Sequence, residues 1–184
     1  MADDDIPLAR RISGGGAVFH DLGNLNYAFI EPRASYGPDR TFNRVIRVLQ
    51  ELGVNAEPMG RSGIGVGGEK ISGNAFCYRR NHVLHHGTLL LSANLDKLRR
   101  YLEPGTITIE THAVRSEPAP VMNLHIDAEE IIEAFGGGAP LPRLDIDESQ
   151  FSRWDWTYGQ TPKFRHKGEA FTRARNAAGQ KFNP

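Results

Sequence analysis

Cysteine is nearly absent from this sequence of 184 residues, which contains Cys77 and no other. One cysteine excludes an intramolecular disulfide and a cysteine-rich zinc site. An excess of one charge is also absent, because 22 Lys and Arg balance 22 Asp and Glu, whereas proteins that bind nucleic acid usually carry a basic surplus. No run of eighteen apolar residues occurs, and the acidic start lacks the apolar segment of a signal peptide. The sequence therefore predicts a cytoplasmic protein without nucleic-acid or membrane partners.

The composition is typical of a globular domain, since 39% of the residues are apolar and 24% are charged. Apolar spacing predicts strands at residues 17–19, 24–30, 64–66, 69–72 and 87–91, and helices at 41–52, 95–102 and 127–135. Gly67 and Gly68 predict a tight hairpin between two of these strands. Hairpins combined with helices favour an α+β domain with a mixed or antiparallel sheet, followed after residue 137 by an irregular stretch.

Three consecutive glycines, Gly14, Gly15 and Gly16, form the first candidate site. Their amide groups can form an anion-binding nest, and Arg10 and Arg11 just before them can pair with phosphate or carboxylate oxygens. The alternative is a flexible turn with surface arginines. The glycines alone favour that alternative, because neither the Walker pattern nor the dinucleotide fingerprint is present.

Lys70 and Ser72 form the second candidate, because regular alternation predicts that they share one face of a strand, with Ile71 on the other. A half-buried lysine favours an anionic ligand as its partner, since an unpaired buried ammonium is costly. An exposed lysine on an edge strand explains the pattern equally well.

Histidine and cysteine offer weaker signals. Adjacent His85 and His86 on one strand point to opposite faces, so at most one of them lines a site. No histidine or carboxylate spacing is typical of a zinc site. Cys77, a few residues after Lys70, is expected to be a small packed side chain, with a nucleophile as the alternative.

Taken in order, five segments resemble landmarks of the lipoate–protein ligase A family. Arg10–Asn24 is similar to the family's Arg-Arg-x-x-Gly-Gly-Gly signature loop, and Lys70–Ala75 to its catalytic-lysine strand. The other three resemble its His-Gly-Thr-Leu-Leu strand, its Val-Arg-Ser and Asn-Leu landmark and its Trp-x-Trp-x-x-Gly-x-x-Pro stretch; they occupy His86–Leu90, Val114–Leu124 and Trp154–Pro162.

The resemblance implies a biotin/lipoate-ligase-like catalytic domain at residues 1–164, with a largely antiparallel sheet packed with helices, and a basic, irregular tail at 165–184. It also implies that lipoate and Mg-ATP form lipoyl-AMP. The lipoyl group then passes to a lysine of an acceptor domain, in a 2-oxoacid dehydrogenase E2 subunit or in glycine cleavage H protein. Lys70 takes the catalytic position, because an acyl-adenylate develops negative charge that its ammonium and the loop amides are suited to stabilise.

Binding contacts are expected from both the glycine loop and the lysine strand. Val18, Phe19 and Ala75 are expected to line an apolar slot for the lipoyl chain. His20 and Asp21 are expected to hold the loop or contact the nucleotide, and His86 to be structural. No metal ligand is expected, and the full set of expected binding residues is Arg10, Arg11, Gly14, Gly15, Gly16, Val18, Phe19, His20, Asp21, Asn24, Ser72, Asn74 and Ala75.

The chain departs from the family pattern in three ways. It begins just before the signature loop, so the catalytic domain is expected to be N-terminally incomplete relative to the family, and it ends soon after the Trp-x-Trp stretch, so no C-terminal accessory domain is expected. Arg61-Ser62-Gly63 stands where the family has Arg-Asn-Asp. Two alternatives follow: an ATP-independent octanoyl or lipoyl acyltransferase acting through Cys77, and a degenerate binding module without activity. A separate chain that supplies the leading segment is a further possibility.

Overall fold

The computed structural model describes residues 6–103, 109–113, 118–140, 142 and 145–166. The chain divides into two compact units. The first unit comprises Met1–Ile12, Glu103–Arg115 and Pro142–Pro184, and the second comprises Ser13–Leu102 and Ser116–Leu141.

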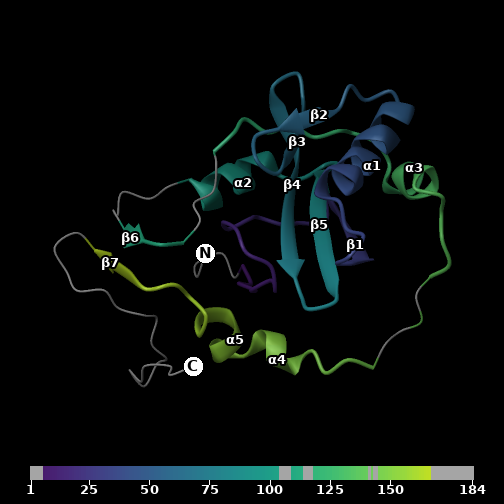
Figure 1. Cartoon of the computed structure of the whole chain (residues 1–184). Coiled ribbons are helices and arrows are strands. Elements are labelled where there is room, and N and C mark those ends of the chain that lie inside the picture. Colours follow the sequence, from purple (N-terminus) through teal and green to yellow (C-terminus); the bar gives the residue numbers. More distant parts are fainter. Residues whose placement is uncertain (1–5, 104–108, 114–117, 141, 143–144, 167–184) are drawn as a thin grey trace. The chain divides into compact units, whose positions relative to one another are not determined.

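Five antiparallel strands form one sheet in the second unit, in the order β1-β5-β4-β3-β2 (Figure 1). Their bounds are Asn24–Pro32 (β1), Glu57–Met59 (β2), Gly63–Val66 (β3), Glu69–Tyr78 (β4) and His82–Leu90 (β5). The predicted hairpin is confirmed, because Gly67 and Gly68 join β3 to β4 with φ of 57° and 86°. The predicted α+β class is confirmed as well. Strands β4 and β5 are longer than the sequence predicted.

Residues 17–19 do not form the predicted strand. Val18 is 54% exposed, and the ring of Phe19 stacks on Tyr101, with the ring centroids 5.6 Å apart. Tyr101 belongs to helix α2 (Leu95–Leu102), which the sequence predicted with these bounds. Phe19 thus packs against a helix instead of pairing across a sheet, and a run of three apolar residues does not distinguish the two arrangements.

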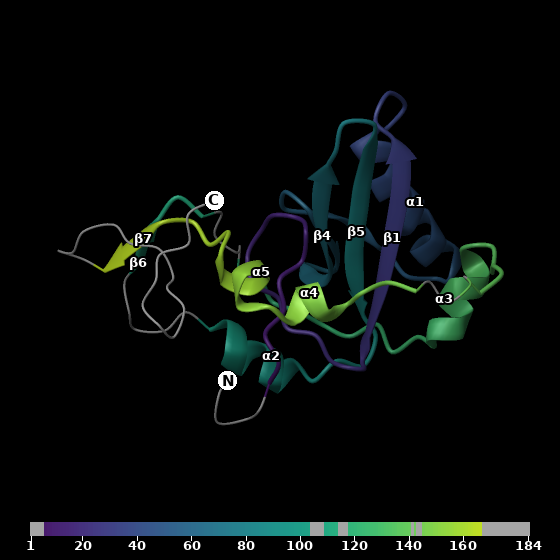
Figure 2. The ribbon, with the colours of Figure 1, turned by 90° about the horizontal axis from the view of Figure 1, so that it is seen from below.

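Helix α1 (Pro38–Glu51) lies against one face of the sheet (Figure 2). Its apolar residues recur at helical spacing and pack in one buried cluster with sheet residues; the cluster includes Val45, Ile46, Leu49, Ile64, Ile71 and Leu89. Pro38 stands in the first turn, where its missing N–H costs no hydrogen bond. Gly53 follows the helix with φ of 82°, as expected for a C-terminal cap.

Helix α3 (Ala128–Ala134) contacts α1 and adds Ile131 to the core. The side chain of Asp127 accepts a hydrogen bond from the backbone N–H of Glu129 at 3.0 Å. This contact confirms the predicted N-cap.

The first unit contains short elements where the sequence predicted an irregular stretch. These are α4 (Ser149–Ser152), α5 (Trp154–Tyr158) and strand β7 (Phe164–His166). Strand β7 pairs antiparallel with β6 (Ile109–Thr111), which lies earlier in the chain. Most of the predicted basic tail, residues 167–184, lies outside the described residues. In the part of the chain that the structure describes, no helix is long and apolar enough to cross a membrane.

Candidate functional site

Lys70 lies at the start of β4, where a bulge changes the alternation of the strand. Strand β3 pairs Ile64 with Ser72 and the next residue, Gly65, with Lys70, so Ile71 is an extra residue. Ile71 and Ser72 are both buried, with 0% and 1% exposure. Lys70 therefore lies on the face opposite to Ser72. The prediction that Lys70 and Ser72 share a face is wrong, because strict alternation holds only in a strand without a bulge.

Small residues lie beneath the Lys70 side chain. A methyl group on Gly63 would stand 3.1 Å from Lys70 Cε, and one on Gly73 would stand 3.8 Å from Lys70 Nζ. Ala75 lies two residues beyond Gly73 on the same face of β4. We call Gly63, Gly73 and Ala75 the glycine–alanine floor; the Lys70 side chain lies against its two glycines, and the Lys70 ammonium offers a partner for an anionic group.

The backbone of Lys70 is held by a third segment of the chain. Its N–H donates to the carbonyl of Pro120 at 2.8 Å, and its carbonyl accepts from the N–H of Met122 at 3.2 Å. Lys70 and Val121 form a parallel bridge. Three segments therefore fix the main chain from which the lysine projects: β3, β4 and residues 120–122.

The glycine loop approaches the face of the sheet that carries Lys70. Ser13 Oγ lies 2.6 Å from His86 Nε2, and His86 pairs with Ala75 across β4 and β5. His86 thus anchors the residue before the three glycines. Gly15 has φ of 105°, a conformation that L side chains disfavour and that suits an amide nest for an anion.

Asp21 closes the other end of this loop. One carboxylate oxygen accepts from the N–H of Gly23 at 2.9 Å and the other from the N–H of Asn94 at 2.8 Å. Asn24 Oδ1 accepts from the N–H of Asp21 at 3.1 Å. Asp21 and Asn24 therefore hold the turn that leads into β1. An open hollow of about 480 Å³ adjoins the turn and is lined by Phe19, Asp21, Leu22, Gly23, Ser92, Asn94 and Lys97.

Ser72 and Asn74 lie on the opposite face, the one that α1 covers. Tyr27 Oη donates to Asn74 Oδ1 and lies 3.2 Å from Ser72 Oγ. His85 Nε2 lies 2.9 Å from the same Asn74 oxygen. Because these groups are turned towards the core, their placement does not support a direct contact between Ser72 or Asn74 and a ligand beside Lys70.

Burial shifts the pKa values of two side chains in this cluster, His85 and Tyr27. It lowers the pKa of His85 to about 4, with a smaller contribution from His86, and raises the pKa of Tyr27 to about 12. Both side chains are therefore neutral near pH 7. The predicted division of His85 and His86 between opposite faces is confirmed, since His85 faces Phe42 of α1 while His86 contacts Ser13.

Arg10 and Arg11 belong to the first unit. Arg10 Nη2 donates to Thr161 Oγ1 at 3.0 Å, and the carbonyl of Arg10 accepts from Trp156 Nε1 at 2.8 Å. Burial, followed by the charge of Arg10, lowers the pKa of Arg11. Arg10 thus joins the start of the chain to the Trp-x-Trp segment within its own unit, and a ligand contact of either arginine stays a prediction.

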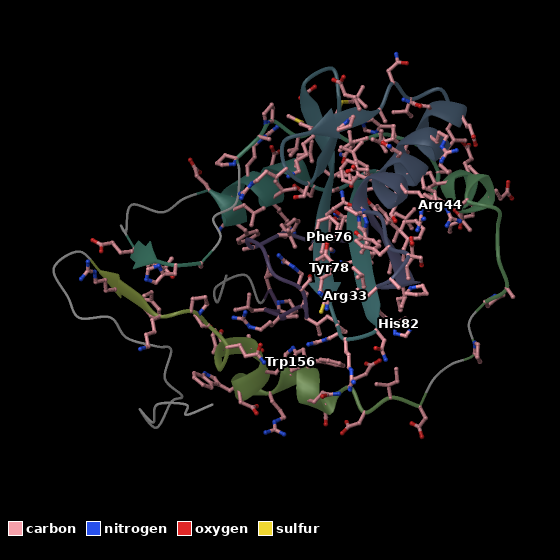
Figure 3. The ribbon with its side chains drawn as sticks, viewed as in Figure 1. Arg33, Arg44, Phe76, Tyr78, His82 and Trp156 are labelled. Atoms are coloured by element: carbon pink, nitrogen blue, oxygen red, sulfur yellow. The ribbon has the colours of Figure 1, made fainter. Side chains whose placement is uncertain are left out.

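Cys77 lies far from Lys70 on β4. It stands between Phe76 and Tyr78, towards the end of the sheet near Arg33 and His82 (Figure 3). Cys77 lies seven positions after Lys70 along the strand, which corresponds to at most about 23 Å. Cys77 is buried, so the placement does not support a shared site with Lys70.

Two residues that bear on the position of Lys70 and its strand are absent from the predicted site residues. Gly63 is predicted only as a departure from the family pattern, yet it forms part of the floor under Lys70. A glycine at the start of an apolar strand is itself a signal for close approach by another group. Tyr27 has no such signal, because its partners Ser72 and Asn74 are more than forty positions away.

Metal ligands do not cluster in the described ranges, since no three His, Cys, Asp or Glu side chains come together there. The geometry defines an α+β domain with a lysine on a floor of small residues, on the sheet face that a glycine loop approaches. Comparison with known proteins identifies the family to which this domain belongs. The chain matches the lipoyl protein ligase A/B catalytic domain over residues 1–135, and it belongs to that family.

Two curated relatives have the name lipoate-protein ligase A. The protein from Psychrobacter cryohalolentis is 39% identical over 195 aligned positions, which cover 90% of this chain and 58% of the relative. The protein from Bdellovibrio bacteriovorus is 33% identical over 199 positions, covering 93% of this chain and 59% of the relative. The chain therefore spans somewhat under three-fifths of these relatives.

Solved structures agree with this assignment. P. falciparum LipL1 in complex with lipoate is 28% identical, with a TM-score of 0.63 over 88% of this chain and 54% of that one. A lipoate-protein ligase A bound with ATP is 26% identical, with a TM-score of 0.58 over 73% of this chain and 58% of that one. A bi-partite ligase from Thermoplasma acidophilum, described with its E2 lipoyl domain, is 26% identical, with a TM-score of 0.61 over 85% of this chain and 72% of that one.

Proposed function

We propose that this chain acts as an ATP-dependent lipoate–protein ligase. The observation that carries the proposal is the position of Lys70, whose ammonium lies over the glycine–alanine floor on the face that the glycine loop approaches. A floor of small residues beside a cation suits a carboxylic acid with an extended apolar chain. The lipoate and ATP in two related structures support this choice of substrates.

The reaction has two steps. In the first, a carboxylate oxygen of lipoate attacks the α-phosphorus of ATP, and pyrophosphate leaves. In the second, the ε-amine of an acceptor lysine attacks the acyl carbon of lipoyl-AMP, AMP leaves, and the amine loses a proton. Negative charge develops first on the phosphate oxygens and then on the acyl oxygen, and we assign the stabilisation of both to Lys70 and the amides of Gly14–Gly16.

Mg²⁺ fits this scheme as an ion bound to the phosphates of ATP. The described residues near Lys70 offer no carboxylate cluster, and magnesium in nucleotide sites is commonly held by substrate phosphates and water with few protein ligands. When bound, the ion would neutralise phosphate charge. We assign no protein ligand to it.

The proposed partners are lipoyl-acceptor domains. The Thermoplasma ligase described with an E2 lipoyl domain supports the E2 class of acceptor, and glycine cleavage H protein is a second candidate. That ligase is also described as bi-partite, which supports the idea that a separate chain completes the site. A cytoplasmic location belongs to the same proposal.

The test measures the intact mass of an apo acceptor domain after incubation with this protein, lipoate and Mg-ATP. We expect a lipoyl mass gain that requires ATP and is lost in Lys70→Ala. Lys163→Ala is the matched control, because Lys163 is an exposed lysine of the first unit, and it should keep the wild-type gain. A gain from an octanoyl carrier protein without ATP would favour the acyltransferase. Absence of any gain from folded protein that still binds ATP would favour a binding module.

A further inference from the structure

A chain of partly buried hydrogen bonds joins the residues before α1 to the loop between β2 and β3. Tyr36 Oη lies 3.2 Å from His85 Nδ1, His85 Nε2 lies 2.9 Å from Asn74 Oδ1, and Asn74 Nδ2 donates to the carbonyl of Ser62 at 3.1 Å. Tyr27 Oη adds a second donor to Asn74 Oδ1. We call these five residues the Asn74 network.

The direction of each bond follows from the amide of Asn74. Its Oδ1 is only an acceptor, so His85 must carry its proton on Nε2, and Nδ1 then accepts from Tyr36. A neutral imidazole meets both needs, and His85 is neutral because it is fully buried. Asn74 uses both ends of its amide, so neither aspartate nor a hydrophobic residue reproduces the network.

Asn74 is also the point where the network meets the main chain. Its backbone N–H donates to the carbonyl of Ser62 at 2.8 Å, in addition to the side-chain bond to the same oxygen. Two hydrogen bonds from one residue therefore fix Ser62. The space for this junction exists because residue 87 is glycine: a methyl group on Gly87 would stand 2.7 Å from Asn74 Oδ1 and 2.5 Å from Tyr27 Oη.

Ser62 is bonded directly to Gly63, which lies beneath the stem of Lys70. Displacement of Ser62 would move Gly63 and the surface against which Lys70 Cε rests. We propose that Asn74 is a positioning residue, which acts from the covered face of the sheet, through Ser62 and Gly63, to place the ammonium of Lys70. This inference rests on the proposed function for its catalytic meaning, whereas the structural link itself can be tested without activity.

The first experiment measures the accessibility of Lys70. The folded protein is acetylated briefly with an N-hydroxysuccinimide ester, and mass spectrometry compares the labelling of Lys70 with that of Lys163 in the same molecule. In Asn74→Ala we expect the Lys70/Lys163 ratio to change by about fivefold, which corresponds to the loss of a net hydrogen bond of about 1 kcal/mol. An unchanged ratio would overturn the proposal.

Two further variants separate positioning from general loosening of the fold. Tyr27→Phe removes one donor to Asn74 and should shift the ratio in the same direction, even where Asn74→Ala folds poorly. Thr41→Val is the matched control, because Thr41 is 2% exposed and its hydroxyl donates to Glu31 Oε1 at 2.8 Å, away from Lys70. It should lower stability and leave the ratio at the wild-type value.

The second experiment measures pyrophosphate release with lipoate and Mg-ATP. We expect Asn74→Ala to lower kcat by about tenfold and to change KM for lipoate by less than about twofold, since a misplaced cation weakens charge stabilisation more than binding. In a Lys70→Ala background the same substitution should have almost no further effect. A raised KM, or an effect that persists without Lys70, would show that Asn74 acts by another route. Wild-type protein that releases no pyrophosphate would count against the proposed function, and the labelling ratio would still decide the structural link.

Discussion

Lys70 Cε lies 3.1 Å from the position that a methyl group on Gly63 would occupy. The two residues come from neighbouring strands, and the hairpin at Gly67 and Gly68 brings them together. A side chain at position 63 and the lysine stem would therefore compete for the same space. The glycine at position 63 is thus linked to the position of the candidate catalytic lysine.

Substitution of Gly63 by alanine tests this floor. The added methyl group would stand 2.6 Å from the carbonyl oxygen of Met59. Because a backbone atom in a strand cannot easily move aside, we expect a loss of about 1–3 kcal/mol in the free energy of unfolding. Acceptor lipoylation should also fall. Urea denaturation and acceptor mass measure the two effects. Gly138→Ala is the control, because no atom lies within 4 Å of its added methyl; equal behaviour of the two variants would contradict the floor.

The elements that could be predicted from the sequence depend on residues close together in the chain. The apolar residues of helix α1 recur every three to four positions. The hairpin needs two adjacent glycines, and the N-cap of α3 joins Asp127 to Glu129. In each case the physical cause lies within one turn of structure.

The orientation of the candidate site could not be predicted in the same way. The bulge at Ile71 depends on how β3 pairs with β4, and it reverses the face on which Lys70 lies. Asn74 was expected to contact ligand, yet its partners Tyr27 and His85 come from two other strands and place it under α1. Arg10 likewise meets Trp156, which is distant in sequence. Contacts between residues far apart in the chain decide these positions, and a local sequence pattern does not reveal such contacts.

The stability of the fold should depend on pH through His85. Burial holds the pKa of His85 at about 4, against an ordinary value of 6.5. Between these values the unfolded chain binds a proton that the folded chain does not. Stability should therefore be complete above pH 6.5 and fall by about 3 kcal/mol as the pH decreases to 4. Urea denaturation at several pH values measures the slope, and NMR titration measures the pKa directly.

A matched pair of variants assigns this slope. His85→Gln should flatten it, whereas His82→Gln should not, because His82 is exposed at the start of β5. An NMR pKa for His85 near 6.5 would contradict the prediction whether or not the variants fold.

Asn123 should be intolerant of a change to aspartate. Its Oδ1 accepts from the N–H of Ala93 at 3.0 Å, and its Nδ2 donates to the carbonyl of Ala93 at 2.9 Å. Asn123→Asp replaces the donor by a charged acceptor, so we expect a loss of about 1–3 kcal/mol at pH 7. Part of the lost stability should be regained below about pH 4, where the carboxyl group of the variant is protonated and can donate a hydrogen bond. Urea denaturation of variant and wild type at both pH values measures the difference, and Asn43→Asp on the exposed face of α1 should show neither effect.

Cys77→Ser distinguishes the ligase from the acyltransferase. Cys77 is 8% exposed and up to about 23 Å along β4 from Lys70, so an acyl carbon held at the Lys70 end of the glycine–alanine floor does not reach its sulfur. We expect lipoylation of the acceptor to continue within about twofold of the wild-type rate, because the nucleophile in the proposed second step is the acceptor lysine. A buried hydroxyl is costlier than a thiol, so stability should fall by roughly 1 kcal/mol. The rate is measured from acceptor mass over time, with Cys77→Ala as a companion that adds no polar group. Two results together would assign the reaction to a cysteine nucleophile and set aside the ligase. Both folded variants would lose transfer, and the wild-type protein would transfer the acyl group without ATP.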